Sequence, residues 1–115
     1  MPVMSENPTP ACFDLVAMLA QRFDPAAARG QEGEIQFFFS GAESGACYLR
    51  MTKTACTFHL GEALYPKLTL RVDCDVWKAI LRGELTWEKA MMERRFLATG
   101  SFPLLAQMPR IFKFG

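Results

Sequence analysis

Few residues could carry out catalysis, and their spacing argues against a shared site. The single histidine, His59, falls in an alternating strand pattern beside Thr57, and Cys56 lies three positions before it. Residues three apart on a strand point to opposite faces, so a Cys–His pair is excluded. Asp73 and Asp75 are close enough for acid–base work, but acidic residues are also common where a helix begins, and we favour capping. The sequence therefore predicts no catalytic residue and no enzyme activity.

The cysteines do not have the spacing of a metal site. None of them forms a C-x-x-C pair, which argues against zinc-ribbon and thioredoxin-like sites. Each lies in an apolar pattern, where a free cysteine behaves as a small hydrophobic residue. Because disulfides are rare in the cytosol, we expect buried, reduced thiols in a cytoplasmic protein, with no metal and no cofactor. These residues are Cys12, Cys47, Cys56 and Cys74.

Composition limits the classes of protein to consider. A length of 115 residues suits one domain, and a formal net charge of +1 argues against nucleic-acid binding. Residues 1–10 have the character of a flexible leader rather than a signal peptide, and one domain is expected over 11–115. The longest charge-free run, 96–109, is too short to span a membrane. Residues 63–115 carry nine basic and five acidic residues, which fits either a solvated surface or attraction to anionic headgroups and transient membrane contact.

Hydrophobic periodicity predicts an α+β fold with the element order ααββββααβα. We expect a five-stranded, mainly antiparallel sheet with helices packed on one face. Its first four strands follow one another closely, so they are expected to form an antiparallel meander with one buried face. Asp24, Asp73 and Thr86 are expected N-caps, and Pro109 is expected to kink or interrupt the last helix. The predicted strands are 34–40, 46–52, 55–60, 67–72 and 96–101; helices are predicted over 11–23, from Pro25 to Gly30, from Asp73 to Gly83, after Thr86 and from Pro103.

Phe38 breaks the alternation of its strand, because its ring points to the face that should carry polar side chains. An exposed ring there would suit self-association, including a homodimer. The leader could equally cover it. Both interpretations stay open.

Soft apolar side chains are abundant. Ten phenylalanines and seven methionines are many for a chain of this length, and several lie in the last quarter. Methionine lines adaptable apolar surfaces well, but an ordinary core uses the same residue types at the same spacings. Because pockets and cores share this composition, the residues alone leave a filled core and a ligand cavity both open.

The order of several segments resembles that of the sterol carrier protein type-two (SCP-2-like) family of sterol- and lipid-binding domains. The strand and helix of 67–83 have a polar cap, an early aromatic residue and a closing glycine, as in that family. Glu84–Met92 is similar to the family's next helix, and Phe96–Ser101 to its last strand with its glycine. Gly30–Gly41 is similar to the first strand and the glycine-containing segment before it. The resemblance covers residues 12–112.

This resemblance implies a hydrophobic tunnel between the sheet and the helices, often closed by the C-terminal helix. Family members bind sterols, fatty acids or acyl-CoA esters. Arg94 and Arg95 depart from the family, which commonly has a glycine and a lysine at this corner. The positions implied to line the tunnel are Phe37, Phe39, Leu49, Trp77, Leu81, Met91, Met92, Phe96, Leu104, Met108 and Phe112.

The leading hypothesis is a non-catalytic lipid-binding or lipid-transfer domain that holds a fatty-acyl or sterol-like ligand in an apolar cavity. Its driving force would be the burial of hydrocarbon. The alternative is a dimerisation or accessory interaction module with a filled core and no ligand, in which Phe38 and the helix faces supply the contact. A small enzyme is the third hypothesis, with His59 as its best candidate.

Overall fold

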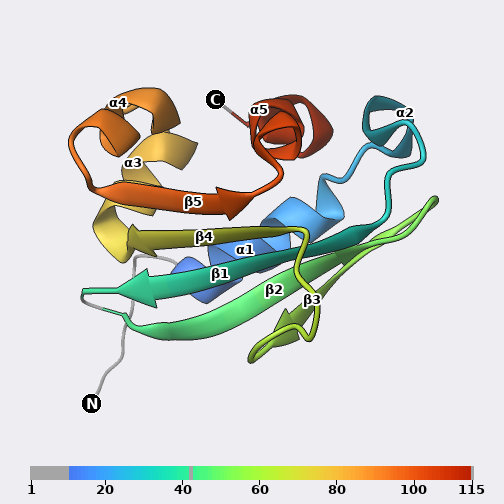
Figure 1. Ribbon diagram of the computed structural model, residues 1–115, viewed down its shortest axis with the longest axis horizontal. Helices are drawn as coiled ribbons and strands as arrows, with labels where there is room; N and C mark the ends of the chain where they lie inside the picture. The colour runs from blue at the N-terminus through green and yellow to red at the C-terminus, as the bar shows by residue number, and fades with distance from the viewer. Residues whose placement is uncertain (1–10, 42, 115) are drawn as a thin grey trace, which may run out of the picture.

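The computed structural model describes residues 11–41 and 43–114, so the expected leader lies outside the described residues. The strands are β1 (Gly33–Ser40), β2 (Gly45–Met51), β3 (Cys56–Leu60), β4 (Leu68–Asp73) and β5 (Phe96–Gly100). The helices are α1 (Cys12–Gln21), α2 (Pro25–Ala28), α3 (Cys74–Leu81), α4 (Trp87–Met92) and α5 (Phe102–Ile111). The strand order in the sheet is β3-β2-β1-β4-β5 (Figure 1).

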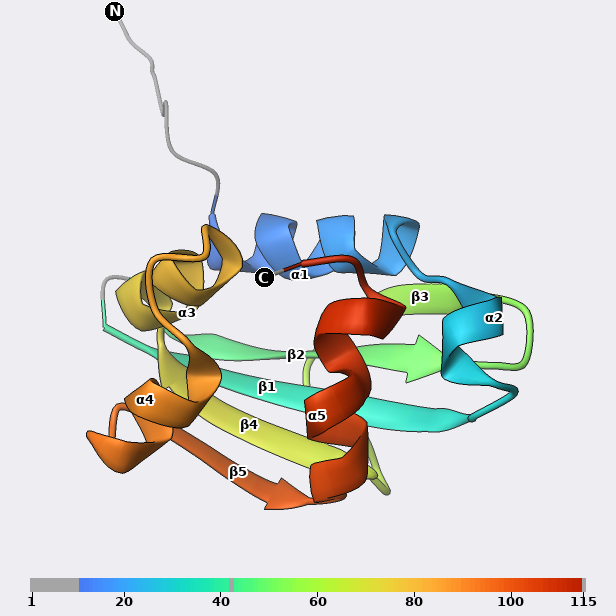
Figure 2. The same cartoon turned by 90° about the horizontal axis from the view of Figure 1, so that it is seen from above.

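Every neighbouring pair of strands is antiparallel except β1 and β4, which are parallel. The sheet is therefore mainly antiparallel, and the predicted α+β class and element order are confirmed. Figure 2 shows α1, α3 and α5 on the same side of the sheet. Helix α1 packs on β2 and β3, while α3 and α5 pack on β4. The core lies between these two layers.

Only β1, β2 and β3 form a meander, so the expectation of a four-stranded meander was wrong. After β3 the chain crosses the sheet and adds β4 beside β1. The crossover segment, residues 61–67, lies over the face opposite α1 (Figure 1). Alternation in the sequence fixes which side chains face inward, but it does not fix which strand becomes the neighbour.

Gln36 of β1 holds the crossover segment against the sheet. Its side chain is 1% exposed, although it points to the face without helices. Nε2 donates hydrogen bonds to the carbonyl oxygens of Cys47 at 3.0 Å and Gly61 at 3.1 Å. Oε1 accepts one from the backbone N–H of Ala63 at 2.6 Å. The buried amide is therefore satisfied by backbone groups of β2 and of the crossover segment.

Three expected N-caps are confirmed. The side chains of Asp24, Asp73 and Thr86 accept backbone hydrogen bonds in the first turns of α2, α3 and α4. Asp73 is thus occupied by capping, with the backbone N–H of Asp75 at 2.8 Å. Pro109 does not interrupt α5, because it lies two residues before the helix ends and removes a single hydrogen bond there.

Aromatic rings fill the space between the sheet and α3. The ring of Trp77 lies 5.4 Å from that of Phe37, 6.4 Å from Phe39 and 6.0 Å from Phe114, measured between centroids. The inward residues of β1, β2 and β4 are buried, as the alternation predicts. Leu60 is different: the alternation of the strand predicted over 55–60 puts it on the inward face with Cys56 and Phe58, but it is 70% exposed because it ends the edge strand β3.

The structure shows the surroundings of Phe38 and Arg94, which both depart from the expected sequence pattern. The ring of Phe38 is half-buried on the face without helices, and the guanidinium of Arg71 lies 4.3 Å from its centre. Arg94 adopts a φ of 60°, the left-handed conformation that glycine accepts most easily. The corner between α4 and β5 thus has a glycine-like backbone without a glycine, at a cost of about 1–2 kcal/mol.

Candidate functional site

An apolar groove lies between α1 and α3, with a cavity volume of about 280 Å³. Leu19 forms part of its buried wall, and Met18 lies at its edge with 40% of its surface exposed. The apolar lining consists of Leu15, Met18 and Leu19 from α1 and Leu81 from α3. Three cations complete the lining, and no carboxylate contributes to it: they are Arg22, Lys78 and Arg82.

Helical periodicity explains why these side chains meet. On α1 and its C-cap residue, positions 15, 18, 19 and 22 are related by spacings of three or four, so they share one face. On α3 and its C-cap residue, positions 78, 81 and 82 follow the same rule. Each helix therefore presents apolar side chains next to basic ones along the groove.

The three cations differ in their partners. Arg82 pairs with Glu84, with Nε 2.9 Å from Oε2. The hydrogen bond to Glu84 is the main cause of the raised pKa of Arg82, and the same bond lowers the pKa of Glu84. Arg22 and Lys78 form no ion pair with any residue in the described ranges. They are consequently available to an anion at the groove.

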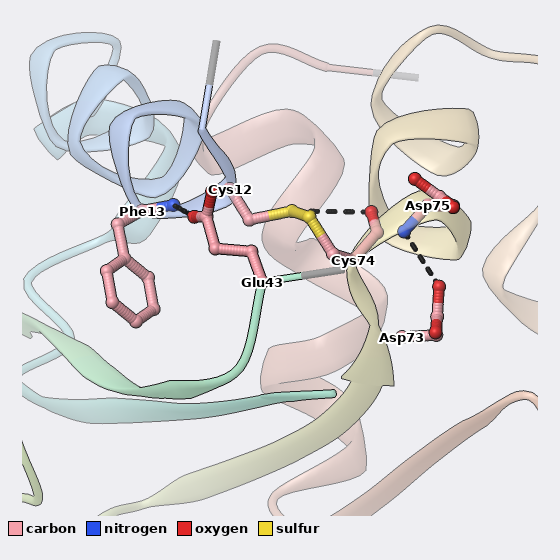
Figure 3. Close-up of a disulfide and its surroundings, with 6 residues drawn as sticks. All are labelled: Cys12, Phe13, Glu43, Asp73, Cys74 and Asp75. Carbon is pink, nitrogen blue, oxygen red and sulfur yellow. Dashed lines mark hydrogen bonds between the residues drawn. A yellow bond between two sulfur atoms is a disulfide. The ribbon is translucent and has the colours of Figure 1, made fainter. Parts of the chain in front are cut away.

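A disulfide joins the beginnings of the two groove helices. Cys12 and Cys74, whose Cα atoms are 5.9 Å apart, form this bond in the core (Figure 3). The expectation of four reduced thiols was therefore wrong for this pair, because the fold brings together two cysteines 62 positions apart. Glu43 fixes the same end of α1 by accepting a hydrogen bond from the backbone N–H of Phe13 at 3.3 Å.

The two other cysteines are free thiols. Cys47 is buried and Cys56 is half-buried. Burial raises the pKa of both thiols to about 12, and the negative charge of Glu43 adds to the effect at Cys47. Protonated thiols are poor nucleophiles. His59 hydrogen-bonds to Thr57 at 2.8 Å and stacks on the ring of Tyr48.

The predicted tunnel residues lie mainly in the packed core. Leu81 also lines the groove, and Met92 is 84% exposed. The buried indole N–H of Trp77 has no hydrogen-bond partner among the described residues. The role of these side chains in binding a ligand stays a prediction, as does the tunnel. Those in the core are Phe37, Phe39, Leu49, Trp77, Phe96, Leu104, Met108 and Phe112, and Met91 packs half-buried against it.

A larger cleft of about 740 Å³ lies where the ends of β1 and β4 meet the start of α3 and the corner between α4 and β5, and its charges are mixed. Arg71, Arg94 and Arg95 line it together with Asp73 and Asp75. The opposite charges reduce its attraction for a simple anion. A third cavity of about 210 Å³ lies among α3, α4 and α5.

The described residues contain no cluster of three or more potential metal ligands. Within the same ranges, 11–41 and 43–114, the helices are too short or too polar to cross a membrane. No protein-family model matches the sequence, and no curated protein matches it. Solved structures do match.

Sterol carrier protein 2-like 2 from Aedes aegypti, solved as the palmitated protein, superimposes with a TM-score of 0.68 at 18% identity, over 88% of this chain and 90% of that one. The apo sterol carrier protein 2 of Yarrowia lipolytica gives 0.65 at 14% identity, over 88% and 86% of the two chains. The chain has a sterol carrier protein 2 (SCP2)-like fold. The structure thereby confirms the fold that the sequence resemblance predicts.

The SCP2-like fold also matches part of a larger enzyme. The sec-alkylsulfatase Pisa1 from Pseudomonas sp. gives a TM-score of 0.73 at 19% identity, over 86% of this chain. This chain spans 15% of the length of that enzyme.

The sequence did not predict the α1–α3 groove, and Leu81 is the one groove residue among the predicted ligand-binding positions. Leu15 and Leu19 belong to the recognised apolar stripe of the first helix, but the sequence does not show that α3 lies beside it.

Proposed function

We propose that the chain is a non-catalytic lipid-binding domain that holds hydrocarbon in the α1–α3 groove. The observation that carries the proposal is the apolar lining of a groove that opens to solvent between two helices. The SCP2-like fold supports it, since the structural neighbours include a palmitated protein and sterol carrier proteins. The proposed ligand site therefore lies at the surface of the helical layer and not in the tunnel that the sequence resemblance implies.

The non-catalytic part of the proposal rests on the state of the reactive side chains. The free thiols are protonated, with pKa values of about 12. Asp73 is engaged in capping α3. His59 lies away from the groove lining and bonds to Thr57. Together these contacts leave the groove with binding chemistry alone.

Hydrocarbon burial sets the expected affinity. Burying about 200 Å² of ligand surface contributes roughly 5 kcal/mol, which corresponds to a dissociation constant of about 0.2 mM before ordering costs and to the millimolar range after them. The groove volume of about 280 Å³ is just below the range for small-molecule sites, which is roughly 300–1,000 Å³. A single alkyl chain therefore fits it better than a sterol ring system.

Calorimetry with 1-decanol and decanoate tests the proposal, and two methionine variants locate the site. We expect both lipids to bind the unmodified protein. Met18→Gln should weaken both by about fivefold, because it places an amide against hydrocarbon. Met92→Gln is the matched control, since Met92 is 84% exposed and outside the groove lining. The proposal would be contradicted if neither lipid bound, or if only Met92→Gln lowered the affinity.

An interaction module is the second candidate function. The observation that favours it is a set of exposed apolar side chains around the crossover segment: Leu60 is 70% exposed, and Leu64 and Tyr65 are each 86% exposed. Sedimentation velocity over a range of concentrations tests it. A dimer that Leu64→Ser/Tyr65→Ser converts to a monomer would support this function, and a protein that is monomeric at all concentrations would rule it out.

A cytoplasmic location stays a prediction. It was inferred from four reduced thiols, and the disulfide between Cys12 and Cys74 means that this reasoning no longer supports it.

A further inference from the structure

We propose that the α1–α3 groove selects single-chain amphiphiles with a monoanionic headgroup, through Arg22 and Lys78. The inference rests on the proposed function, because it concerns the ligand of the same groove. It adds a specific chemistry: the hydrocarbon lies on the leucines and Met18, and the anion lies at the basic edge. Neutral lipids and cationic amphiphiles of equal chain length bind more weakly.

The charge of the lining carries this inference. The groove has three cations and no carboxylate among its lining residues. Glu84 faces Arg82 from beyond the end of α3 and pairs with it. Arg22 and Lys78 form no ion pair within the described ranges. The cleft of about 740 Å³ at the start of α3 differs in this respect, since three arginines and two aspartates line it together.

The position of the cations relative to the disulfide determines which end of the groove the ligand headgroup occupies. The disulfide joins the first residues of α1 and α3, whereas Arg22 follows the last residue of α1 and Lys78 lies in the last turn of α3. The apolar residue Leu15 lies nearer the disulfide along α1. A headgroup at the basic end therefore leaves the alkyl chain directed toward the disulfide end of the groove.

Basic residues at helix C-termini also stabilise the helix dipole, so their presence alone has a structural explanation. That explanation predicts an effect on stability and none on the choice of ligand. The experiment separates the two by measuring a ratio of affinities between two ligands. A general change in stability leaves this ratio unchanged.

The test compares decanoate, 1-decanol and decyltrimethylammonium by calorimetry at pH 8 and low salt, with the two charged amphiphiles below their micelle concentrations and decanol below its solubility limit. With the unmodified protein, decanoate should bind about tenfold more tightly than decanol, because two partly exposed charge pairs contribute modestly. Decyltrimethylammonium should bind more weakly than decanol. Raising the salt concentration to about 0.3 M should reduce the preference for decanoate, since exposed charges are screened.

The double variant Arg22→Gln/Lys78→Gln should bring the decanoate-to-decanol ratio to about one while decanol affinity is kept. Lys53→Gln/Lys89→Gln is the control, because it removes two exposed cations that do not line the groove. A ratio that the groove variant leaves unchanged, or that the control lowers equally, overturns the inference. Decanol binding without a preference for decanoate also overturns it and leaves the proposed function standing. If neither lipid binds, the proposed function itself fails.

Discussion

Gln36 shows how much one side chain can contribute when its hydrogen bonds join separate segments. The residue type suggests a surface position on an alternating strand, yet the amide is 1% exposed. Its partners are carbonyl oxygens of β2 and backbone groups of the crossover segment. Removing the amide leaves these partners buried without hydrogen bonds, which costs more than the bonds themselves contribute.

We expect Gln36→Leu to lower the free energy of unfolding by about 3 kcal/mol, given the usual cost of unsatisfied buried groups. Urea denaturation measures this change. Gln21→Leu is the control, because Gln21 is exposed on α1 and its replacement should stay within about 0.5 kcal/mol of the unmodified protein. Equal effects of the two substitutions would show that the crossover segment does not depend on Gln36.

The free cysteines give a second prediction at the residue scale. Their pKa values are raised from 9.0 to about 12, chiefly by burial, so the native thiols should react slowly with iodoacetamide at pH 8. Thiol titration should find two thiols after denaturation and four after denaturation with reduction. Four thiols without a reductant would contradict the disulfide.

The same shifts predict how stability changes in alkaline solution. A raised folded-state pKa contributes stability that is fully present below pH 9.0 and is lost as the pH rises toward about 12. Urea midpoints measured between these limits should therefore fall with increasing pH. A Cys56→Ala variant should show a smaller fall, because one of the two titrating groups is gone.

At the scale of elements, the disulfide between Cys12 and Cys74 links α1 covalently to α3. It closes a loop over a sequence separation of 62 residues, and loops of this length contribute about 4 kcal/mol through the entropy of the unfolded chain. We expect Cys12→Ala/Cys74→Ala to lower the free energy of unfolding by about this amount, measured by urea denaturation under oxidising conditions. Cys56→Ala is the control, with a loss of about 1 kcal/mol. A double variant as stable as the control would show that packing alone holds the helices together.

Tertiary contacts fix the beginning of helix α1. Its N-cap position, Ala11, makes no side-chain hydrogen bond. The helix is fixed instead by the disulfide, by the hydrogen bond from Phe13 to Glu43 and by the tilted contact between the rings of Phe13 and Phe39. The groove wall is therefore set by contacts to α3 and the sheet and not by the local sequence of α1.

At the scale of the whole molecule, a ligand that binds the folded state should stabilise it. Decanoate at about ten times its dissociation constant should add roughly 1.4 kcal/mol and raise the melting temperature by about 5 °C. Differential scanning fluorimetry measures the shift, with Met18→Gln expected to reduce it at the same concentration. An unchanged melting temperature at saturating decanoate would contradict binding to the native groove.

The sequence by itself determined the element order, the caps and the inward face of most strands. These features depend on neighbours a few positions away, so periodicity and residue type carry them. The buried rows of β1 and β4 and the caps at Asp24, Asp73 and Thr86 show this directly. The resemblance to sterol carrier proteins added the SCP2-like fold, which the structural neighbours confirm.

Only the tertiary structure decided the pairing of β4 with β1, the disulfide and the α1–α3 groove. Each joins residues far apart in the sequence, such as Cys12 and Cys74 at a separation of 62. Leu60 faces solvent for the same reason, since its exposure depends on which elements cover β3. Local patterns specify which way a side chain points, whereas long-range packing specifies what it meets there, and binding depends on the latter.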